Sequence, residues 1–370
     1  MAGTAALESI LGVAPLTEAL RVTTSGIPDP FPAELSKVKP QNRFLGDRAR
    51  WRRLYGARTT AKLAAYGSGG RRVPLQQIAQ QDVRMLYIAL EFFIDANMLA
   101  KLTSFESYTQ DEGLDFVRLQ LEELGKRIHN TEIVAKATML RYGAIYWDAD
   151  GNILPSSSGA TYTTSSQVGA NNQNQLNGII SQSWALPNTD IFGQIRALQF
   201  QSAQNTGLRI KNGMYGINTP LRLQTNSTLQ AYFVRNPGFR DRLVETGEIP
   251  KNFGGIENWI PAWDAFFEDQ NGNKQALWDN DLVVFTPDMG GPEAKMDWWA
   301  WCQGSCATLS GFDAHADPIG ALKNVRQEYG QSGWAVPRLE APLGIVVYLQ
   351  SCFLPAIRNE LAVFQAETVF

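Results

Sequence analysis

The chain has 370 residues and a net charge of −3, with 44% hydrophobic residues. This size exceeds what one compact core usually holds, so we expect two subdomains or one domain with long appendages. The hydrophobic content excludes a globally disordered chain. Charged residues make up 19%, below the ~25% usual in soluble domains, which indicates a neutral surface or one buried against partners. The overall charge gives no reason to expect nucleic-acid binding.

Residue types that support catalysis or metal binding are scarce. The two histidines, His129 and His315, offer little for imidazole catalysis or a zinc site. The three cysteines (Cys302, Cys306 and Cys352) form no disulfide framework, and we expect small buried thiols in a reducing compartment. Nucleotide-binding, nucleophile-elbow and zinc-protease motifs do not occur. We therefore expect no enzyme, no catalytic residue, no cofactor and no metal.

The sequence also predicts no membrane partner. No stretch approaches the roughly 18 apolar residues that a membrane-spanning helix needs. The first twenty residues lack the basic region of a secretory signal, and Glu8 and Glu18 interrupt their apolar side chains. We therefore expect the protein to be made in the cytoplasm.

The charges are strongly segregated along the chain. Residues 43–72 carry nine basic side chains and one acidic side chain, a local charge of +8. The residues that follow this segment carry −10. The small net charge therefore conceals a basic arm that precedes an acidic body.

The basic segment is predicted to form a long hairpin or extended loop over residues 43–79. Strand alternation in RARWRRLY separates most arginines from the aromatic residues: Arg48, Arg50 and Arg52 share one face, and Trp51, Arg53 and Tyr55 the other. Three interpretations remain open for this segment. It is a solvated loop, an arm that binds nucleic acid through arginine and aromatic stacking, or a strap that docks on an acidic surface of another subunit.

The clearest element is a long amphipathic helix over residues 109–142. Its apolar side chains recur at three- and four-residue steps, at Leu114, Val117, Leu121, Leu124, Ile128, Val134, Ala137 and Leu140. Acidic residues occupy its first turns and Arg141 its last, as the helix dipole favours. We expect His129 on the solvated side. Residues 80–102, before the helix, are dense in apolar side chains and predict a buried helix or a pair of strands.

The segment after the helix is polar. Residues 148–152, DADGN, predict a tight turn, because the calcium-loop pattern lacks its glycine at position six and its glutamate at position twelve. Residues 151–189 contain no charged residue in 39 positions. This composition suits a simple surface loop, or a loop that packs beside copies of itself without charge repulsion.

The following residues predict short helices and turns. Asp190 is expected to cap a helix that ends at Gly207. Residues 208–227 predict short strands and turns, and residues 228–243 a second helix that is interrupted near Pro237.

The last third predicts strands. The Asn-Gly pair at 271–272 indicates a hairpin. Two terminal strands are expected over residues 344–354 and 361–369, separated by a turn over residues 355–360. An extended arm, a long helix, a mixed middle and terminal strands argue for an α+β fold and against a doubly wound sheet.

A cluster of tryptophans leaves one catalytic alternative open. Paired carboxylates beside aromatic platforms are typical of carbohydrate-active enzymes, and this cluster contains Trp259, Trp263, Trp278, Trp298, Trp299 and Trp301 near Glu257, Asp264, Glu268 and Asp269. The competing interpretation is that these rings build a core or an interface.

The order of these parts resembles a tailed-phage major capsid protein, of the capsid protein E type of lambda-like phages with the Hong Kong 97 fold. The resemblance covers about residues 28–370 and rests on IPDPFPAEL, RARWRRLYGARTTAKLAAYGSGGRRVPL, DNDLVVFTPDMG and GIVVYLQSCFLPAIRNELAVFQAETV. It implies an N-terminal arm (1–42), an extended loop (43–79), a peripheral domain with a spine helix (80–150), the uncharged loop (151–189), an axial domain (190–335) and peripheral return strands (336–370).

The resemblance also implies a function. It predicts a subunit that self-assembles into hexamers and pentamers of an icosahedral phage head, encloses double-stranded DNA without sequence-specific binding, and belongs to the virion after assembly in the host cytoplasm. Scaffolding, portal and decoration proteins are the other implied partners. A protein compartment of the same fold that encloses enzymes is the alternative.

In this fold the extended loop is similar to a strap over the adjacent subunit. We therefore expect contacts between subunits that join the arginines to the acidic residues of the long helix. The arginines are Arg50, Arg52, Arg53, Arg58, Arg71 and Arg72, and the acids Asp111, Glu112, Asp115, Glu122 and Glu123.

Overall fold

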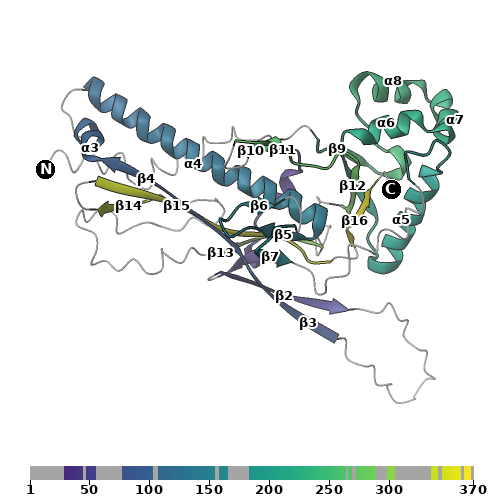
Figure 1. Ribbon diagram of the computed structural model, residues 1–370. Helices are drawn as coiled ribbons and strands as arrows, with labels where there is room; N and C mark the ends of the chain where they lie inside the picture. The colour runs from purple at the N-terminus through teal and green to yellow at the C-terminus, as the bar shows by residue number, and fades with distance from the viewer. Residues whose placement is uncertain are drawn as a thin grey trace, which may run out of the picture.

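The computed structural model describes two packed bodies and a protruding hairpin (Figure 1). The described residues are 29–44, 47–55, 77–102, 107–154, 158–165, 183–263, 266–268, 272–288, 298–304, 335–340, 344–359 and 362–367. Each body has its own large hydrophobic cluster. The α+β class is confirmed.

In the first body a long helix lies across a five-stranded sheet (Figure 1). The helix α4, Ser107–Tyr142, confirms the predicted amphipathic helix. The described members of its apolar stripe are buried: Val117, Leu124, Ile128, Val134, Ala137 and Leu140. The sheet contains β1 (Arg43–Phe44), β4 (Leu86–Asp95), β13 (Trp299–Gly304), β14 (Ala335–Glu340) and β15 (Gly344–Ile357). Residues 80–102, predicted as a buried helix or a pair of strands, contain the end of β3 (Gln77–Arg84), all of β4 and the short helix α3 (Ala96–Leu102).

The β2–β3 hairpin projects away from this body (Figure 1). Strands β2, Arg48–Tyr55, and β3, Gln77–Arg84, pair antiparallel from Arg48–Arg84 to Tyr55–Gln77. This pairing confirms a hairpin in the basic segment, whose residues 56–76 lie outside the described chain. Ala49, Trp51 and Val83 are buried, so one face of its base belongs to the core.

The segment before the hairpin is packed against α4 and β13. It contains two short 3-10 helices, η1 (Ala33–Ser36) and η2 (Pro40–Asn42). Phe31 and Leu35 are buried in the first core, and the indole nitrogen of Trp299 donates to the Leu35 carbonyl at 2.9 Å. Residues 29–42 are therefore anchored on their own chain. The rest of the predicted arm lies outside the described residues.

A three-stranded sheet follows α4. Its strands are β6 (Ile153–Leu154), β5 (Ala144–Trp147) and β7 (Tyr162–Ser165), in that order. The predicted turn at residues 148–152 is confirmed, because the Asp148 carboxylate accepts from the backbone and side-chain nitrogens of Asn152 at 2.8 and 2.9 Å. Part of the uncharged segment therefore belongs to a sheet.

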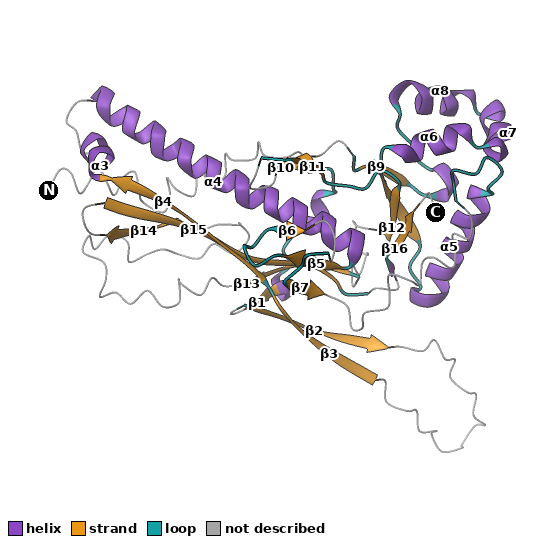
Figure 2. Cartoon of the chain, viewed as in Figure 1, coloured by secondary structure: helices purple, strands orange, loops and turns teal. Residues whose placement is uncertain are grey.

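The second body packs helices on a four-stranded sheet (Figure 2). The sheet order is β16-β12-β8-β9, with bounds Phe364–Glu367, Leu282–Pro287, Ile210–Tyr215 and Asn258–Pro261. The helices are α5 (Ile191–Thr206), α6 (Asn218–Thr225), α7 (Ser227–Arg235) and α8 (Pro237–Thr246), with a 3-10 turn η4 at Phe253–Gly255. The predicted cap at Asp190 and stop at Gly207 are confirmed, with Gly207 left-handed at φ 75°. The predicted 271–272 hairpin pairs β10 (Phe266–Glu268) with β11 (Lys274–Ala276).

Two local predictions are wrong. Residues 218–225 form α6, because Pro220 falls in the first helical turn, where a missing N–H removes no helical bond. The turn predicted from Pro355 is instead part of β15, which continues to Ile357. Proline is tolerated there because pairing with β4 stops at Phe353, so that edge of β15 has no partner strand among the described residues.

Two strands lie in a different body from the one expected. Strand β16 pairs with β12 in the second body, although residues 336–370 were expected to return to the first. Strand β13 pairs with β15 in the first body, although residues 190–335 were expected to form the second. Strand pairing couples segments far apart in sequence, which a linear division of the chain cannot represent.

Candidate assembly surfaces

The exposed face of the β2–β3 hairpin is basic. Arg48, Arg50 and Arg84 are exposed, and the register confirms the predicted alternation with buried Ala49 and Trp51. Asp82 on β3 partly neutralises this face, with its carboxylate 3.0 Å from Arg50 Nε and 3.7 Å from Arg48 Nη1. Arg50 therefore has an ion-pair partner on its own chain. These pairs are exposed, so each contributes at most about 1 kcal/mol.

The buried face of the hairpin fixes its base. Trp51 is 6% exposed, and the Arg358 guanidinium carbon lies 5.9 Å from the centre of its ring. Arg358 also donates to the Asn42 side-chain oxygen at 2.7 Å. Arg358, which directly follows β15, therefore connects the base of the hairpin to the arm. Because Trp51 is part of the core, it cannot stack on nucleic-acid bases, which removes one support for the nucleic-acid interpretation.

The predicted acidic residues of α4 have different environments. Glu112 pairs with Lys101 at 3.4 Å and Glu123 with Arg127 at 3.0 Å, both on this chain. Asp115 is exposed, and Glu122 is half-buried. The Asp111 side chain lies outside the described residues.

The predicted arginines are described only in part. The side chains of Arg52 and Arg53 lie outside the described residues, as do Arg58, Arg71 and Arg72 entirely. Within one chain, no recorded ion pair of the described residues joins the hairpin arginines to α4.

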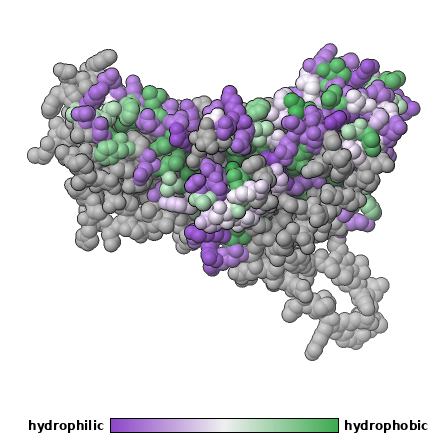
Figure 3. All heavy atoms as spheres, in the orientation of Figure 1, coloured by the Kyte–Doolittle hydropathy of each residue, from purple (hydrophilic) through white to green (hydrophobic). Residues whose placement is uncertain are grey.

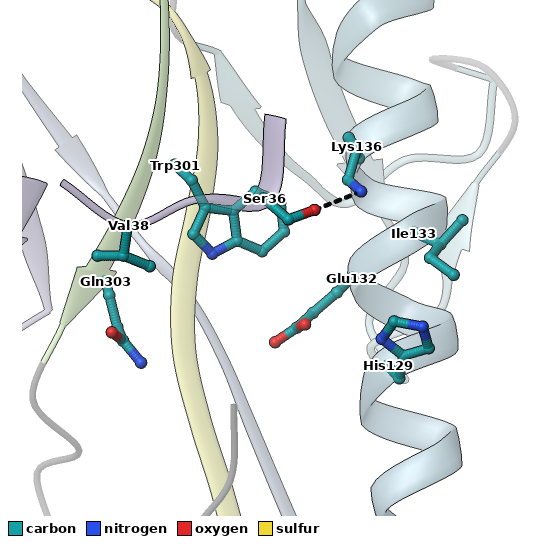
Figure 4. Close-up of a pocket in the computed structure, with 8 residues that line it drawn as sticks. All are labelled: Ser36, Val38, His129, Glu132, Ile133, Lys136, Trp301 and Gln303. Atoms are coloured by element: carbon teal, nitrogen blue, oxygen red, sulfur yellow. Dashed lines mark hydrogen bonds between the residues drawn. The ribbon is translucent and has the colours of Figure 1, made fainter. Parts of the chain in front are cut away.

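A buried charge cluster holds the arm on α4, and Figure 4 shows its hydrogen bond between Lys136 and Ser36. Lys136 is 1% exposed, and its Nζ lies 2.5 Å from the Asp29 carboxylate and 2.6 Å from Ser36 Oγ. The ammonium also lies 5.6 Å from the centre of the Phe31 ring and 5.7 Å from that of Trp301. A carboxylate, a hydroxyl and two ring faces thus replace the water that Lys136 loses. The sequence signal that could have revealed this cluster is a lysine between the stripe residues Val134 and Ala137.

His129 does not lie on the solvated side of the helix as predicted, because it lines a pocket beside this cluster. His129 is half-buried and lines the pocket with Glu132 and Lys136 instead of projecting freely into solvent (Figure 4). Burial lowers the pKa of His129, the Lys136 charge lowers it further, and Asp29 opposes these effects. Glu132 is buried, and its carboxylate accepts from Ser351 Oγ at 3.3 Å. The pocket therefore lies between the arm, α4 and β13.

A second buried cation joins α4 to the second body. Arg141 is buried, and its guanidinium pairs with both carboxylate oxygens of Asp279 and donates to the Leu277 carbonyl at 3.2 Å. Its Nη2 lies 2.7 Å from the Tyr142 hydroxyl, whose pKa is raised chiefly by burial. The last turn of α4 is therefore tied to the segment between β11 and β12.

Five of the six tryptophans of this cluster belong to the hydrophobic core, and Trp263 is half-buried against it. Trp259, Trp278, Trp298, Trp299 and Trp301 are all buried. The nearby Glu257 carboxylate pairs with Lys211 at 3.3 Å, whereas Asp264 and Asp269 lie outside the described residues. Buried rings offer no platform to a sugar, so the geometry does not support the carbohydrate-active alternative.

The two described thiols are buried, as predicted. Burial raises the pKa of Cys302 and that of Cys352 to about 11 each, so both remain protonated and unreactive. Cys306 lies outside the described residues.

Comparison with known proteins gives structural similarity alone. No family model matches the chain, and no curated protein matches it. Among solved structures, a phage-related protein from Bordetella bronchiseptica RB50 is 12% identical, with 82% of each chain covered and a TM-score of 0.44. The structure of Gordonia phage Cozz is 10% identical, covering 93% of this chain and 87% of that one, with a TM-score of 0.46.

Two further similarities concern particles. The satellite phage P4 procapsid structure is 10% identical over 96% of this chain and 90% of that one, with a TM-score of 0.42. A virus-like particle from Pyrococcus furiosus is 10% identical over 95% and 98%, with a TM-score of 0.38. These four similarities cover between 82% and 96% of this chain.

Proposed function

We propose that this chain is a major capsid protein that assembles into hexamers and pentamers of a closed icosahedral phage head. The observation that carries the proposal is the β2–β3 hairpin, which projects from the body (Figure 1). Its arginines Arg48, Arg50 and Arg84 are exposed. An arm of this kind is suited to a neighbouring copy. A head-to-tail contact between identical subunits generates a closed ring when the rotation closes.

The strength of each contact fits reversible assembly. Exposed ion pairs contribute about 0–1 kcal/mol each, so one contact forms and breaks readily. Several pairs per contact, repeated around a ring, add to a stable assembly through multivalency. From the sequence, the surface of the neighbouring copy expected to bind the hairpin arginines is the set of acidic residues on α4. These residues are Asp111, Glu112, Asp115, Glu122 and Glu123.

Hydrophobic side chains add to the contact surface. At the end of the molecule that carries the helices α6–α8, hydrophobic patches interrupt the hydrophilic surface (Figure 3). Leu221, Val234 and Val244 are exposed on these helices. Contact with a second copy would remove these side chains from water, which stabilises the assembled state.

The contents of the shell follow from charge. A body with a net negative charge repels the DNA backbone, which would let the genome slide along the wall without sequence-specific binding. Scaffolding, portal and decoration proteins are the further proposed partners, and the virion, assembled in the host cytoplasm, is the proposed location. The alternative, a compartment of the same fold with enzyme cargo, differs in whether DNA or protein is inside.

Charge reversal on the hairpin tests this proposal. Reversing Arg52 and Arg53 to Glu should abolish particles at physiological salt, as seen by electron microscopy, while the thermal unfolding of the subunit stays unchanged. Lys251→Glu, at an exposed turn of the second body, is the matched control and should leave particles intact. Normal particles from the doubly reversed chain would contradict a role for the hairpin.

A further inference from the structure

Strand β4 has one covered face and one exposed face. Ile88 and Leu90 pack against Leu124 and Ile128 of α4, and Ile94 is fully buried. The alternate residues point the other way: Tyr87 is 47% exposed and Phe93 50% exposed. The outer edge of β4 also lacks a strand partner among the described residues, since β4 pairs with β15 alone. Large aromatic side chains beside an unpaired strand edge are typical of a docking site.

The exposed face of β4 is acidic as well as aromatic. Glu91 lies between Tyr87 and Phe93 on this face, is exposed, and forms no ion pair with another described residue. Asp95 follows on the same face and accepts from the Met98 backbone nitrogen at 2.7 Å. No basic residue occurs between residues 86 and 95. A carboxylate flanked by aromatic rings suits a guanidinium group.

The acidic residues of α4 provide a weaker receptor. Glu112 and Glu123 already pair with Lys101 and Arg127, which places cations among the acids. An incoming arginine must compete with these partners. At Glu91 of β4, an incoming arginine displaces no basic partner among the described residues.

The hairpin and the β4 face lie on opposite sides of the hairpin base. Strand β3 ends at Arg84, and β4 begins at Leu86 and extends away from the paired strands β2 and β3 (Figure 1). Met85 between them is buried, and its backbone nitrogen donates to the Asp47 carbonyl at 2.7 Å. One copy therefore presents a basic hairpin at one end and an acidic, aromatic strand at the other, which is a head-to-tail arrangement.

We infer that the exposed face of β4, centred on Tyr87, Glu91 and Phe93, is the surface that receives the basic hairpin of a second copy. This inference rests on the proposed function and replaces the α4 acids by β4 as the receptor. The hairpin arginines pair with Glu91 and cover the aromatic rings, and a hairpin strand lies along the free edge of β4.

Photo-cross-linking tests this directly. The change Phe93→p-benzoylphenylalanine keeps an aromatic residue at an exposed position, and a mixture of ¹⁵N-labelled and unlabelled copies identifies adducts between different chains. We expect irradiated particles to contain adducts from residue 93 to residues 43–79 of another copy. The matched control is Phe116→p-benzoylphenylalanine, at an exposed position of α4, which should give few such adducts.

Charge reversal gives a second readout. Glu91→Arg should raise the protein concentration needed for assembly about tenfold or more, whereas Asp115→Arg on α4 should change it less than about twofold. Both variants should unfold at the wild-type temperature, because both side chains are exposed. Particles whose hairpin adducts come from residue 116 and not from residue 93 would overturn the inference and leave the proposed function standing. A wild-type chain that never assembles would overturn both.

Discussion

Lys136 shows how a single side chain connects two distant segments. It lies in the apolar half of α4, yet its ammonium is held by Asp29 and Ser36 of the arm. Burying an ammonium without a partner costs several kcal/mol, so arm and helix stabilise each other at this point. The periodicity of α4 predicts a buried face there, but it does not identify which segment supplies the counter-charge.

Removing this cation should destabilise the fold. In Lys136→Ala the partly buried Asp29 carboxylate loses its partner, and we expect the free energy of unfolding to fall by about 3 kcal/mol. Urea denaturation measures this change. Arg127→Ala, which removes an exposed pair with Glu123 on the same helix, should cost about 0.5 kcal/mol or less. Equal costs for the two variants would contradict the role given to Lys136.

His129 should make the stability depend on pH. Burial lowers its pKa below the ordinary value of 6.5, so the unfolded chain binds the proton first as pH falls. The contribution of this residue to the free energy of unfolding is therefore constant above about pH 6.5 and decreases as pH falls toward the folded-state pKa. His129→Gln should lose less stability than the wild type between about pH 7.5 and pH 5, by urea denaturation at each pH. Identical pH profiles would contradict this.

At the scale of secondary-structure elements, the sequence predicted the features that depend on interactions between residues close together in the chain. The 3.6-residue period of residues 109–142, the cap at Asp190 and the Asn-Gly hairpin were all identified from sequence. The continuation of β15 through Pro355 was not, because it depends on which strand lies alongside. The exposed face of β4 was missed for the same reason: residues 86–95 are apolar throughout most of their length, and only the position of α4 distinguishes their two faces.

Residues 56–76, beyond the paired part of the hairpin, should contribute to assembly and not to the folding of their own chain. Replacing residues 56–76 by Asn-Gly joins Tyr55 to Gln77 through a two-residue turn and preserves the β2–β3 pairing. We expect a subunit with wild-type thermal stability that forms no particles, as measured by calorimetry and by sedimentation velocity. Particles of normal size from this variant would contradict the strap role.

At the scale of the whole molecule, the charge distribution is the central feature. A net charge of −3 arises from a +8 segment and an acidic remainder, and the described basic residues project from one side of the hairpin base. Segregated charges steer identical subunits into one relative orientation and oppose others. The sequence predicted this separation, whereas the placement of the hairpin and the exposed face of β4 on opposite sides of the hairpin base required the structure.

Assembly should therefore depend on ionic strength. Salt screens exposed charges over about 8 Å at 0.15 M and about 3 Å at 1 M. We expect light scattering to show slower assembly and a higher concentration threshold as NaCl increases over this range. Assembly that is unaffected by salt would indicate that apolar contacts alone join the subunits.

The most direct test of the central claim is cryo-electron microscopy of the purified wild-type protein, incubated at increasing concentration at physiological salt. We predict closed shells of hexamers and pentamers in which density for residues 43–79 of each copy lies over the first body of its neighbour. A protein that remains monomeric at every concentration, or rings in which this segment contacts only its own chain, would contradict the account.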